Sequence, residues 1–331
     1  MDPVTQGLLG AAAAQAVLAR RLGPRTWLYG ALGGMAADLD VLIRSSTDPM
    51  VAIVYHRHFT HSLAFVPIGG LICALPWLLS RRHRDRRWLV LVATTIGYAT
   101  HGLLDAFTSY GTQLWWPFSS QRVAWNFVAI VDPIYTGMLA IGVVLARRRG
   151  SPNAARLALV LSSLYVALGG VLHARALAAV RRVAHDRGHV IARVEAFPEL
   201  PVNFVWRSTY RAGGRIHIDR VRTPWLGPVT VDDGSSIAVV DESDLPPGIV
   251  ADARLLSAFR TFAWFADGWV GRSPEAPDLL GDSRYGPATT SSDALWSLRL
   301  EPGADKPVQI VQQRPPGGAA LAQRWREIVG R

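Results

Sequence analysis

The chain has 331 residues, half of them hydrophobic, and a formal net charge of +10 at pH 7. The charge is unevenly divided, because residues 1–180 contain seven Asp but no Glu and no Lys, and arginine supplies all of their basic side chains. These arginines lie in short clusters without interleaved aromatic residues, so the high isoelectric point does not indicate a nucleic-acid partner. We expect no nucleic acid among the ligands.

Six apolar runs in the first 180 residues predict a membrane α-helical bundle of about six transmembrane helices. In chain order they are residues 4–19, 27–43, 63–79, 88–107, 125–146 and 155–179. Several approach the ~20 residues that a helix needs to cross the hydrocarbon core. The first two are rich in Gly and Ala, which suits helices packed inside a bundle.

The arginine clusters predict the orientation of these helices. If the amino terminus lies outside, the inner loops "ARRLGPR", "RRHRDRR" and "ARRRGSPNAAR" hold 12 basic residues, and the outer segments hold four. Cytoplasmic loops carry the excess of Lys and Arg in membrane proteins. The pattern therefore predicts a multi-pass protein of the inner (cytoplasmic) membrane, with everything after the sixth helix outside the cytoplasm.

Residues 181–331 form the predicted second domain, an extracytoplasmic, β-rich α+β soluble domain that follows the membrane domain of residues 1–180. Short β-branched and aromatic runs there are separated by Gly, Pro and Asp, as in strands joined by turns. The stretch "YRAGGRIHI" predicts a hairpin with a Gly-Gly turn. The stretch "LPPGIVADARLLSAFRTFAWF" predicts one helix.

Titratable residues near the membrane helices are the candidate functional residues, since charged side chains are costly in a bilayer. Asp38 and Asp40 end the second apolar run, and they can face one site only if the helix ends or unwinds there. His101 and Asp105 are spaced i, i+4 in the fourth run and share one helix face, a common way to present two metal ligands.

The remaining candidates flank other helices. His56 and His61 precede the third run, and Asp132 lies early in the fifth, beside Pro133. The predicted orientation places all of the candidate residues in one layer near the outer face. This common depth is the observation that favours a shared site. His58 is as well explained by solvation and is left outside the predicted ligand set.

Imidazole and carboxylate ligands without thiolate suit a divalent metal, with Zn²⁺ first and Mn²⁺ or Fe²⁺ as alternatives. The ligand set is large enough for one or two ions. The predicted ligands are Asp38, Asp40, His56, His61, His101 and Asp105. An unligated Asp can act as a general base, and Asp38 and Asp132 are the candidate catalytic residues.

The motifs "MDPVTQGLLGAA", "ADLD", "HRHFTHSL" and "GYATHGLLDAFTSYGTQLWWPFS" resemble those of the YdjM-like family of inner-membrane proteins, which are proposed to be metal-dependent hydrolases. The resemblance covers roughly residues 1–145. It implies a multi-helix membrane fold and a metal site at Asp38, Asp40, His56, His61, His101 and Asp105. The chain departs from the family pattern at His58, usually Gly, and at Gln6, where a His is often found.

We therefore expect a membrane-bound metal-dependent hydrolase with its site at the outer membrane face, acting on a phosphoester or another lipid-linked substrate. Two alternatives stay open. An ion-coupled transporter would use the Asp and His residues as a proton or cation site, and a metal-stabilised membrane scaffold would bind metal without turnover.

Overall fold

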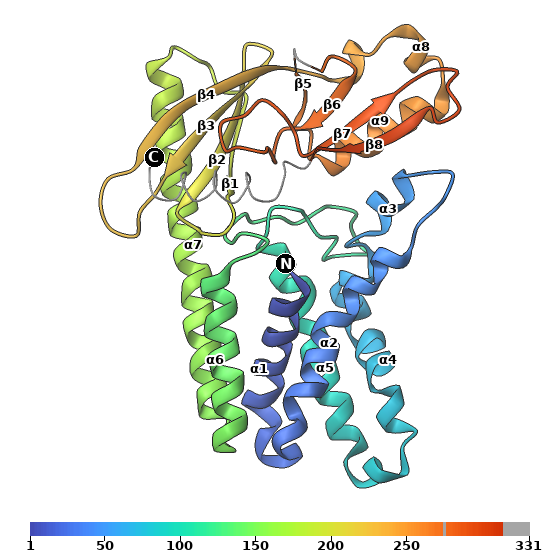
Figure 1. Ribbon diagram of the computed structural model, residues 1–331, viewed down its shortest axis with the longest axis vertical. Coiled ribbons are helices and arrows are strands. Elements are labelled where there is room, and N and C mark those ends of the chain that lie inside the picture. The colour runs from blue at the N-terminus through green and yellow to red at the C-terminus, as the bar shows by residue number, and fades with distance from the viewer. Residues whose placement is uncertain (274–275, 314–331) are drawn as a thin grey trace. The chain divides into compact units, whose positions relative to one another are not determined.

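The structure is a computed structural model that describes residues 1–273 and 276–313. Figure 1 shows the path of the chain, which divides into two compact units. The first unit consists of residues 1–43, 55–170 and 200–202, and the second contains the rest of the described chain. The division falls inside a long helix, α7 (Asn153–Asp186). The predicted domain boundary at residue 180 lies in the same helix and stays a prediction.

Each of the predicted apolar segments contains a helix. These helices are α1 (Pro3–Leu22), α2 (Thr26–Ala36), α4 (Val66–Leu78), α5 (Arg87–Ala106), α6 (Pro133–Arg149) and α7, and a short helix, α3 (Met50–Tyr55), precedes α4. The fifth segment differs from the prediction, since α6 begins at Pro133 and not near residue 125. Asp132 caps this helix by accepting hydrogen bonds from the N–H groups of Ile134 and Tyr135. Proline at the first helical position strengthens this start.

Fewer membrane spans meet a length and hydropathy criterion than the six predicted. Among the described residues, Arg84–Ala106 and α7 are long and apolar enough to cross a membrane. A third span results if Met50–His61 and Leu63–Leu78, which are bent by 59°, count as one. Helices α2 and α6 have only 11 and 17 residues. The count of six spans is therefore not confirmed.

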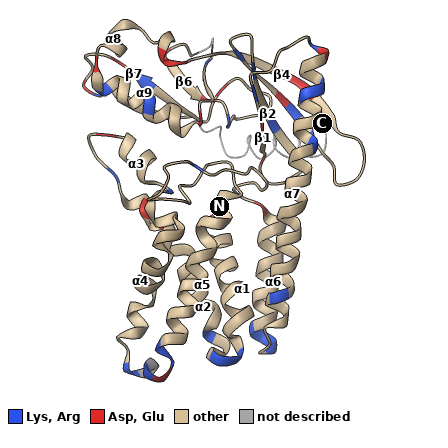
Figure 2. Ribbon diagram, turned by 180° about the vertical axis from the view of Figure 1, so that it is seen from behind, with Lys and Arg blue, Asp and Glu red and all other residues tan. Residues whose placement is uncertain are grey.

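The two ends of the helices in the first unit differ in charge. Helix α1 ends with Arg20 and Arg21, α6 ends with three arginines, and an arginine-rich 3-10 turn, η5 (Arg81–Arg86), leads into α5. Figure 2 shows these basic residues together at one end of the helices. The start of α1, the end of α5 and the start of α6 lie at the opposite end. The predicted orientation depends on this asymmetry, and the orientation itself stays a prediction.

Glycine residues allow α1, α2 and α5 to pack closely. A Cβ atom on Gly30 would lie 2.2 Å from the carbonyl oxygen of Gly10, and one on Gly97 would lie 2.1 Å from the carbonyl oxygen of Gly30. Both distances are far inside van der Waals contact, so only glycine fits at these crossings. The packing brings the end of α2 beside the last turns of α5.

Two irregular segments lie at the end of the bundle opposite the arginines. Helix α2 passes directly into a 3-10 helix, η2 (Ala37–Leu42), and two further 3-10 turns, η3 (Phe59–His61) and η4 (Leu63–Phe65), lead into α4. Helix α5 supports the second segment, because the Tyr98 hydroxyl donates to the Thr60 carbonyl at 2.7 Å. A Cβ atom on Gly102 would lie 2.0 Å from the His61 carbonyl oxygen. The missing side chain of Gly102 thus lets the backbone at His61 approach α5.

The second unit contains an antiparallel sheet in which each strand pairs with the next along the chain. In the described residues its strands are β1 (Arg193–Pro198), β2 (Val205–Ala212), β3 (Arg215–Arg222), β4 (Thr230–Val239), β5 (Val270–Arg272), β6 (Leu279–Asp282), β7 (Trp296–Leu300) and β8 (Val308–Gln312). The predicted hairpin is confirmed, because Gly213 and Gly214 join β2 to β3 with φ of 57° and 71°. The buried core of this unit includes Trp269 and Ile218.

The segment predicted as one helix in this unit contains two, α8 (Pro247–Val250) and α9 (Ala253–Phe265). The single-helix prediction is wrong because Asp252 starts a new helix by accepting hydrogen bonds from the N–H groups of Arg254 and Leu255. The last part of the predicted second domain, residues 314–331, lies outside the described residues.

Candidate metal centre

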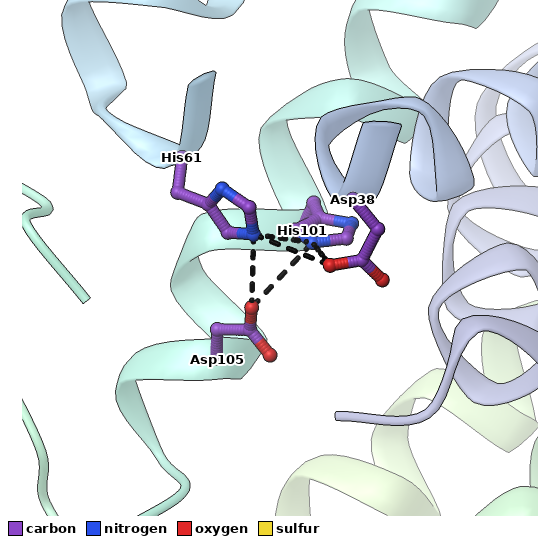
Figure 3. A group of neighbouring side chains, drawn as sticks. All are labelled: Asp38, His61, His101 and Asp105. Atoms are coloured by element: carbon purple, nitrogen blue, oxygen red, sulfur yellow. Dashed lines mark hydrogen bonds and ion pairs between the residues drawn. The ribbon is translucent and has the colours of Figure 1, made fainter. Parts of the chain in front are cut away.

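Four predicted site residues converge at the end of the bundle opposite the arginines. They are Asp38 from η2, His61 from η3, and His101 and Asp105 from α5. One ligand atom from each lies within 4.8 Å of the others. Figure 3 shows the side chains pointing toward a common centre.

The local structure explains how these residues meet. His101 and Asp105 are one turn apart on α5 and share a face, as the sequence predicts. The change from α2 to the 3-10 helix η2 turns Asp38 toward them, which meets the condition that the helix must unwind. His61 reaches the same point because Gly102 admits its backbone close to α5.

Five of the six distances between the ligand atoms are close to those around a tetrahedral ion. The two Nε2 atoms of His61 and His101 are 3.0 Å apart. Asp38 Oδ1 lies 3.5 Å from His61 Nε2 and 3.3 Å from His101 Nε2. Asp105 Oδ2 lies 3.3 and 3.5 Å from the same two atoms. A tetrahedral ion with bonds of about 2.1 Å separates its ligands by about 3.4 Å.

Hydrogen bonds on the far side of each imidazole fix which nitrogen faces the centre. His101 Nδ1 lies 2.5 Å from the Gly34 carbonyl, which can only accept, so Nδ1 carries the proton. His61 Nδ1 lies 3.0 Å from the Thr60 hydroxyl oxygen, which donates its own proton to Asp40 and so accepts here, and 3.2 Å from Asp40 Oδ2. In the neutral rings both Nε2 atoms therefore present lone pairs to the centre.

The centre is thus surrounded by acceptors without a donor among them. Asp105 Oδ2 is buried and has no hydrogen-bond partner in the described part of the chain. Two imidazole lone pairs and two carboxylate oxygens at this spacing could hold a metal ion between them. The donor set is of the kind that Zn²⁺, Mn²⁺ and Fe²⁺ use.

Asp40 and His56, also predicted as ligands, lie beside the four residues and are not part of the convergent group. Asp40 Oδ2 accepts from the backbone N–H of Arg57 at 2.8 Å and from the Thr60 hydroxyl at 3.0 Å. Asp40 Oδ1 lies 2.9 Å from His56 Nδ1. These contacts place Asp40 behind His61, where it orients the ring, and His56 behind Asp40.

Asp105 is held by a separate group of donors on its other oxygen. Gln6 Nε2 donates to Oδ1 at 2.9 Å, Arg57 Nη2 lies 3.3 Å away, and the Met1 amino group contacts the same oxygen. Gln6, at the position where the family pattern often has His, thus supports Asp105 through its amide nitrogen. Sequence reasoning missed Arg57, whose only signal was its place between His56 and His61.

The two other residues considered lie in different surroundings. Asp132, predicted as catalytic, is buried and is engaged by the cap of α6 and by the Tyr165 hydroxyl, which donates to it at 2.7 Å. It is not one of the four convergent residues. The His58 ring packs among aromatic side chains, 5.5 Å from Tyr55 and 5.6 Å from Trp116 between ring centroids.

Of the four residues, only Asp38 has an exposed side chain. The side chains of His61, His101 and Asp105 are 0% exposed, and that of Asp38 is 18% exposed. His56 behind the site is 24% exposed. An incoming molecule would therefore meet Asp38 first.

The depth of the centre follows from its place on α5. His101 lies 14 residues after Arg87, the first residue of the helix, which is about 21 Å along the axis at 1.5 Å per residue. A hydrocarbon core is about 30 Å thick. If the arginines mark one membrane interface, the centre lies within the far third of the bilayer.

Comparisons with known proteins cover the helical region and part of the sheet domain. The family described as YdjM inner membrane protein matches residues 1–176, which include all four convergent residues. The uncharacterized protein YfhP of Bacillus subtilis (strain 168) is 28% identical over 243 residues, which are 71% of this chain and 70% of that protein. The inner membrane protein YbcI of Escherichia coli (strain K12) is 32% identical over 114 residues, 32% of this chain and 63% of YbcI. No solved structure matches.

Proposed function

We propose that this chain, which belongs to the YdjM inner membrane protein family, is a membrane-bound metal-dependent hydrolase. The proposal depends chiefly on the tetrahedral arrangement of Asp38, His61, His101 and Asp105 around a centre that has acceptors and no donor. The site would lie at the outer membrane face and act on a phosphoester or another lipid-linked substrate. The sheet domain would then be extracytoplasmic.

The three fully buried residues, His61, His101 and Asp105, are the proposed permanent ligands of one ion. Zinc is our first choice, with manganese or iron as the alternatives. The structure gives less support for a second ion, because Asp40 Oδ1 and His56 Nδ1 are 2.9 Å apart and form a hydrogen bond with each other. We assign Asp40 and His56 to hydrogen bonds that orient His61.

Asp38 is proposed to have a double role because it alone of the four has an exposed edge. A site with four fixed protein ligands is closed and structural, whereas catalytic zinc sites keep one position for water or substrate. A bound ion would supply Lewis-acid chemistry and lower the pKa of a coordinated water toward ~7. Asp38, with its exposed edge, would be the residue that accepts a proton at this position. Asp132 stays a predicted catalytic residue that its contacts do not favour.

Elemental analysis of the purified protein and its variants tests the metal site without a known substrate. We expect stoichiometric metal in the wild type and its loss in His61→Ala and Asp105→Ala, because each change removes a buried ligand. His58→Ala is the matched control, since that ring contacts aromatic residues outside the site, and it should keep the metal. Stoichiometric metal in both ligand variants would overturn the assignment.

Asp38→Asn tests the catalytic part separately. The amide oxygen can still approach the ion but cannot accept a proton. We therefore expect retained metal with a loss of at least ~100-fold in kcat on a panel of phosphoesters and lipid-linked substrates. Metal binding without turnover on any substrate would favour the scaffold alternative, and metal-dependent uptake into proteoliposomes would favour the transporter.

A further inference from the structure

We infer that Arg57 is the anion-binding residue of the proposed metal site, and that the substrate group it receives is a phosphoryl group. The inference rests on the proposed function and narrows its substrate class. It starts from a buried guanidinium that lies against the convergent residues and has unused donors.

The side chain of Arg57 is 5% exposed and lies against Asp105. Its Nη2 is 3.3 Å from Asp105 Oδ1, and its Nη1 donates to the Thr108 hydroxyl at 2.9 Å. Its guanidinium carbon lies 4.7 Å from the centre of the Tyr110 ring. The buried Nε atom has no hydrogen-bond partner within the described residues. A guanidinium has five N–H donors, and these contacts leave part of that capacity unused.

Two other buried arginines show how this chain satisfies a guanidinium that only supports the fold. Arg207 donates through Nε, Nη1 and Nη2 to the carbonyl oxygens of Ser283, Ala288, Thr289 and Ser291. Arg284 donates to the carboxylate of Asp282 and to the Phe265 carbonyl. In both of them Nε has a partner. Of these three buried arginines only Arg57 has an unpaired Nε, a feature that it shares with the less buried Arg87, Arg211, Arg222 and Arg272. Arg57 is distinguished from these by its contact with Asp105, one of the four convergent residues.

The backbone at Arg57 is also unusual. Its φ is 61°, the left-handed region that a residue with a side chain rarely adopts. This conformation lets the Arg57 N–H donate to Asp40 at 2.8 Å while the side chain reaches Asp105. Arg57 therefore contacts both Asp40, which orients His61, and Asp105, one of the four convergent residues. Strained backbone of this kind concentrates at functional sites.

The charges of the site indicate which ligand it accepts. Asp38, Asp40 and Asp105 contribute three negative charges, and a divalent ion, Arg57 and the Met1 amino group on Asp105 offset them. Arg57 adds positive charge beside the ion, which favours the approach of an anionic group. A phosphoryl group suits this pair, because its oxygens can contact a metal ion and a guanidinium at once. A neutral carboxylic ester gives the guanidinium no charge to bind.

The test compares Arg57→Lys and Arg57→Gln with wild type, all loaded with zinc. Arg156→Gln is the matched control, because it removes the same charge from the first turn of α7 at the arginine-rich end of the bundle. Three readouts are needed: metal content, the affinity for inorganic phosphate by titration calorimetry, and kcat/KM on a phosphoester and on a neutral carboxylic ester.

We expect Arg57→Gln to keep its metal and to bind phosphate ~10–100-fold more weakly, the usual range for losing a hydrogen bond to a charged group. Arg57→Lys should lose less phosphate affinity than Arg57→Gln, because lysine keeps the positive charge. Activity on the phosphoester should fall in the same order, without a parallel fall on the neutral ester. Arg156→Gln should match wild type in every readout.

Two results would overturn the inference. One is equal phosphate affinity in wild type and both Arg57 variants. The other is loss of metal from both variants, which would make Arg57 only the counter-ion of Asp105. If the wild type binds phosphate through Arg57 but turns over no substrate, the proposed hydrolase function fails and the anion site stands.

Discussion

Asp38 and Asp40 are two residues apart in η2, but they contact different atoms of the site and so have different proposed roles. Asp38 faces the two Nε2 atoms, whereas Asp40 faces the Nδ1 atom of His61 from behind. A carboxylate behind a ligating imidazole fixes the ring and raises its basicity. The two aspartates should therefore respond differently to the same substitution.

We predict that Asp40→Asn weakens metal binding ~10–100-fold without abolishing it, the usual cost of losing such a partner. Competition with a chromogenic chelator measures the affinity. Asp132→Ala is the control, because it removes the cap of α6 and should lower stability by about 1 kcal/mol with no change in metal affinity. Complete loss of metal in Asp40→Asn would instead make Asp40 a direct ligand.

Part of the candidate site could be predicted from residue spacing. Helix geometry places the i, i+4 pair His101 and Asp105 on one face. The common predicted depth in the membrane added His61 and Asp38 to the predicted site, and both are among the convergent residues. Spacing could not separate Asp40 from Asp38, since the separation depends on the 3-10 geometry of η2. Arg57 was missed because an arginine near a membrane interface has an ordinary explanation in the sequence.

At the scale of elements, the site depends on how closely α2 and α5 approach. Asp38 follows α2, and His101 and Asp105 lie on α5, so a wider gap between these helices would pull the ligands apart. Gly97 is at their crossing, where a Cβ atom would lie 2.1 Å from the Gly30 carbonyl oxygen.

Gly97→Ala should therefore lower stability by ~1–3 kcal/mol, as overpacking does, and should also weaken metal binding. Gly137→Ala is the matched control, since it also lies in a helix but a Cβ atom there meets nothing within 4 Å. It should be neutral or slightly stabilising, because alanine favours a helix. Thermal unfolding in detergent and elemental analysis measure the two effects. Unchanged metal content in Gly97→Ala would show that the site tolerates a shift of α5.

The elements themselves were predictable where hydrophobic runs are long and uninterrupted. The limits of α5 are within one residue of the predicted run, because apolar periodicity and flanking arginines mark them. The start of α6 was placed too early, since residues 125–132 are apolar without being helical. Their backbone pairs instead with neighbouring loop groups, as when the N–H of Trp125 donates to the Ala106 carbonyl.

At the scale of the whole molecule, we expect different solution conditions to destabilise the two units: metal removal the first, and acid the second. The proposed metal site lies in the first unit, and His217 with the neighbouring His189, Tyr210 and Arg187 lies in the second. Burial lowers the pKa of His217, and the nearby His189 and Arg187 lower it further. The ring also stacks on Tyr210, at 4.7 Å between centroids. Other charges near it are Asp219, which raises the pKa, and Arg215, which lowers it.

We predict two thermal unfolding transitions. A chelator should lower the midpoint temperature of the first unit, and acid should lower that of the second. Removing the metal costs the first unit about 2.7 kcal/mol if the ion was present at 100 times its Kd. The folded second unit takes up the His217 proton at a lower pH than the unfolded chain does. Its stability is therefore complete above about pH 6.5 and falls as the pH drops below that value.

His217→Gln provides the control for the acid effect, since it should flatten the pH dependence of the second transition and leave the chelator effect unchanged. Scanning calorimetry from pH 7.5 to 5.5, with and without chelator, measures both. A second transition with the same pH dependence in wild type and His217→Gln would contradict the role of His217.

The 3-10 turns η3 and η4, which interrupt the helical chain before α4, have a consequence for how the protein enters the membrane. Interrupted backbone in a bilayer must find polar partners inside the protein, and α5 provides one through the Tyr98 hydroxyl, which donates to the Thr60 carbonyl. A nascent chain that ends before α5 would hold the Thr60 carbonyl without this partner. We expect the translocon to release α4 only after α5 has emerged, so that the two helices insert as a hairpin. Alkaline extraction of nascent chains truncated after residue 80 or after residue 110 would test this, since stable insertion of the shorter chain would contradict it.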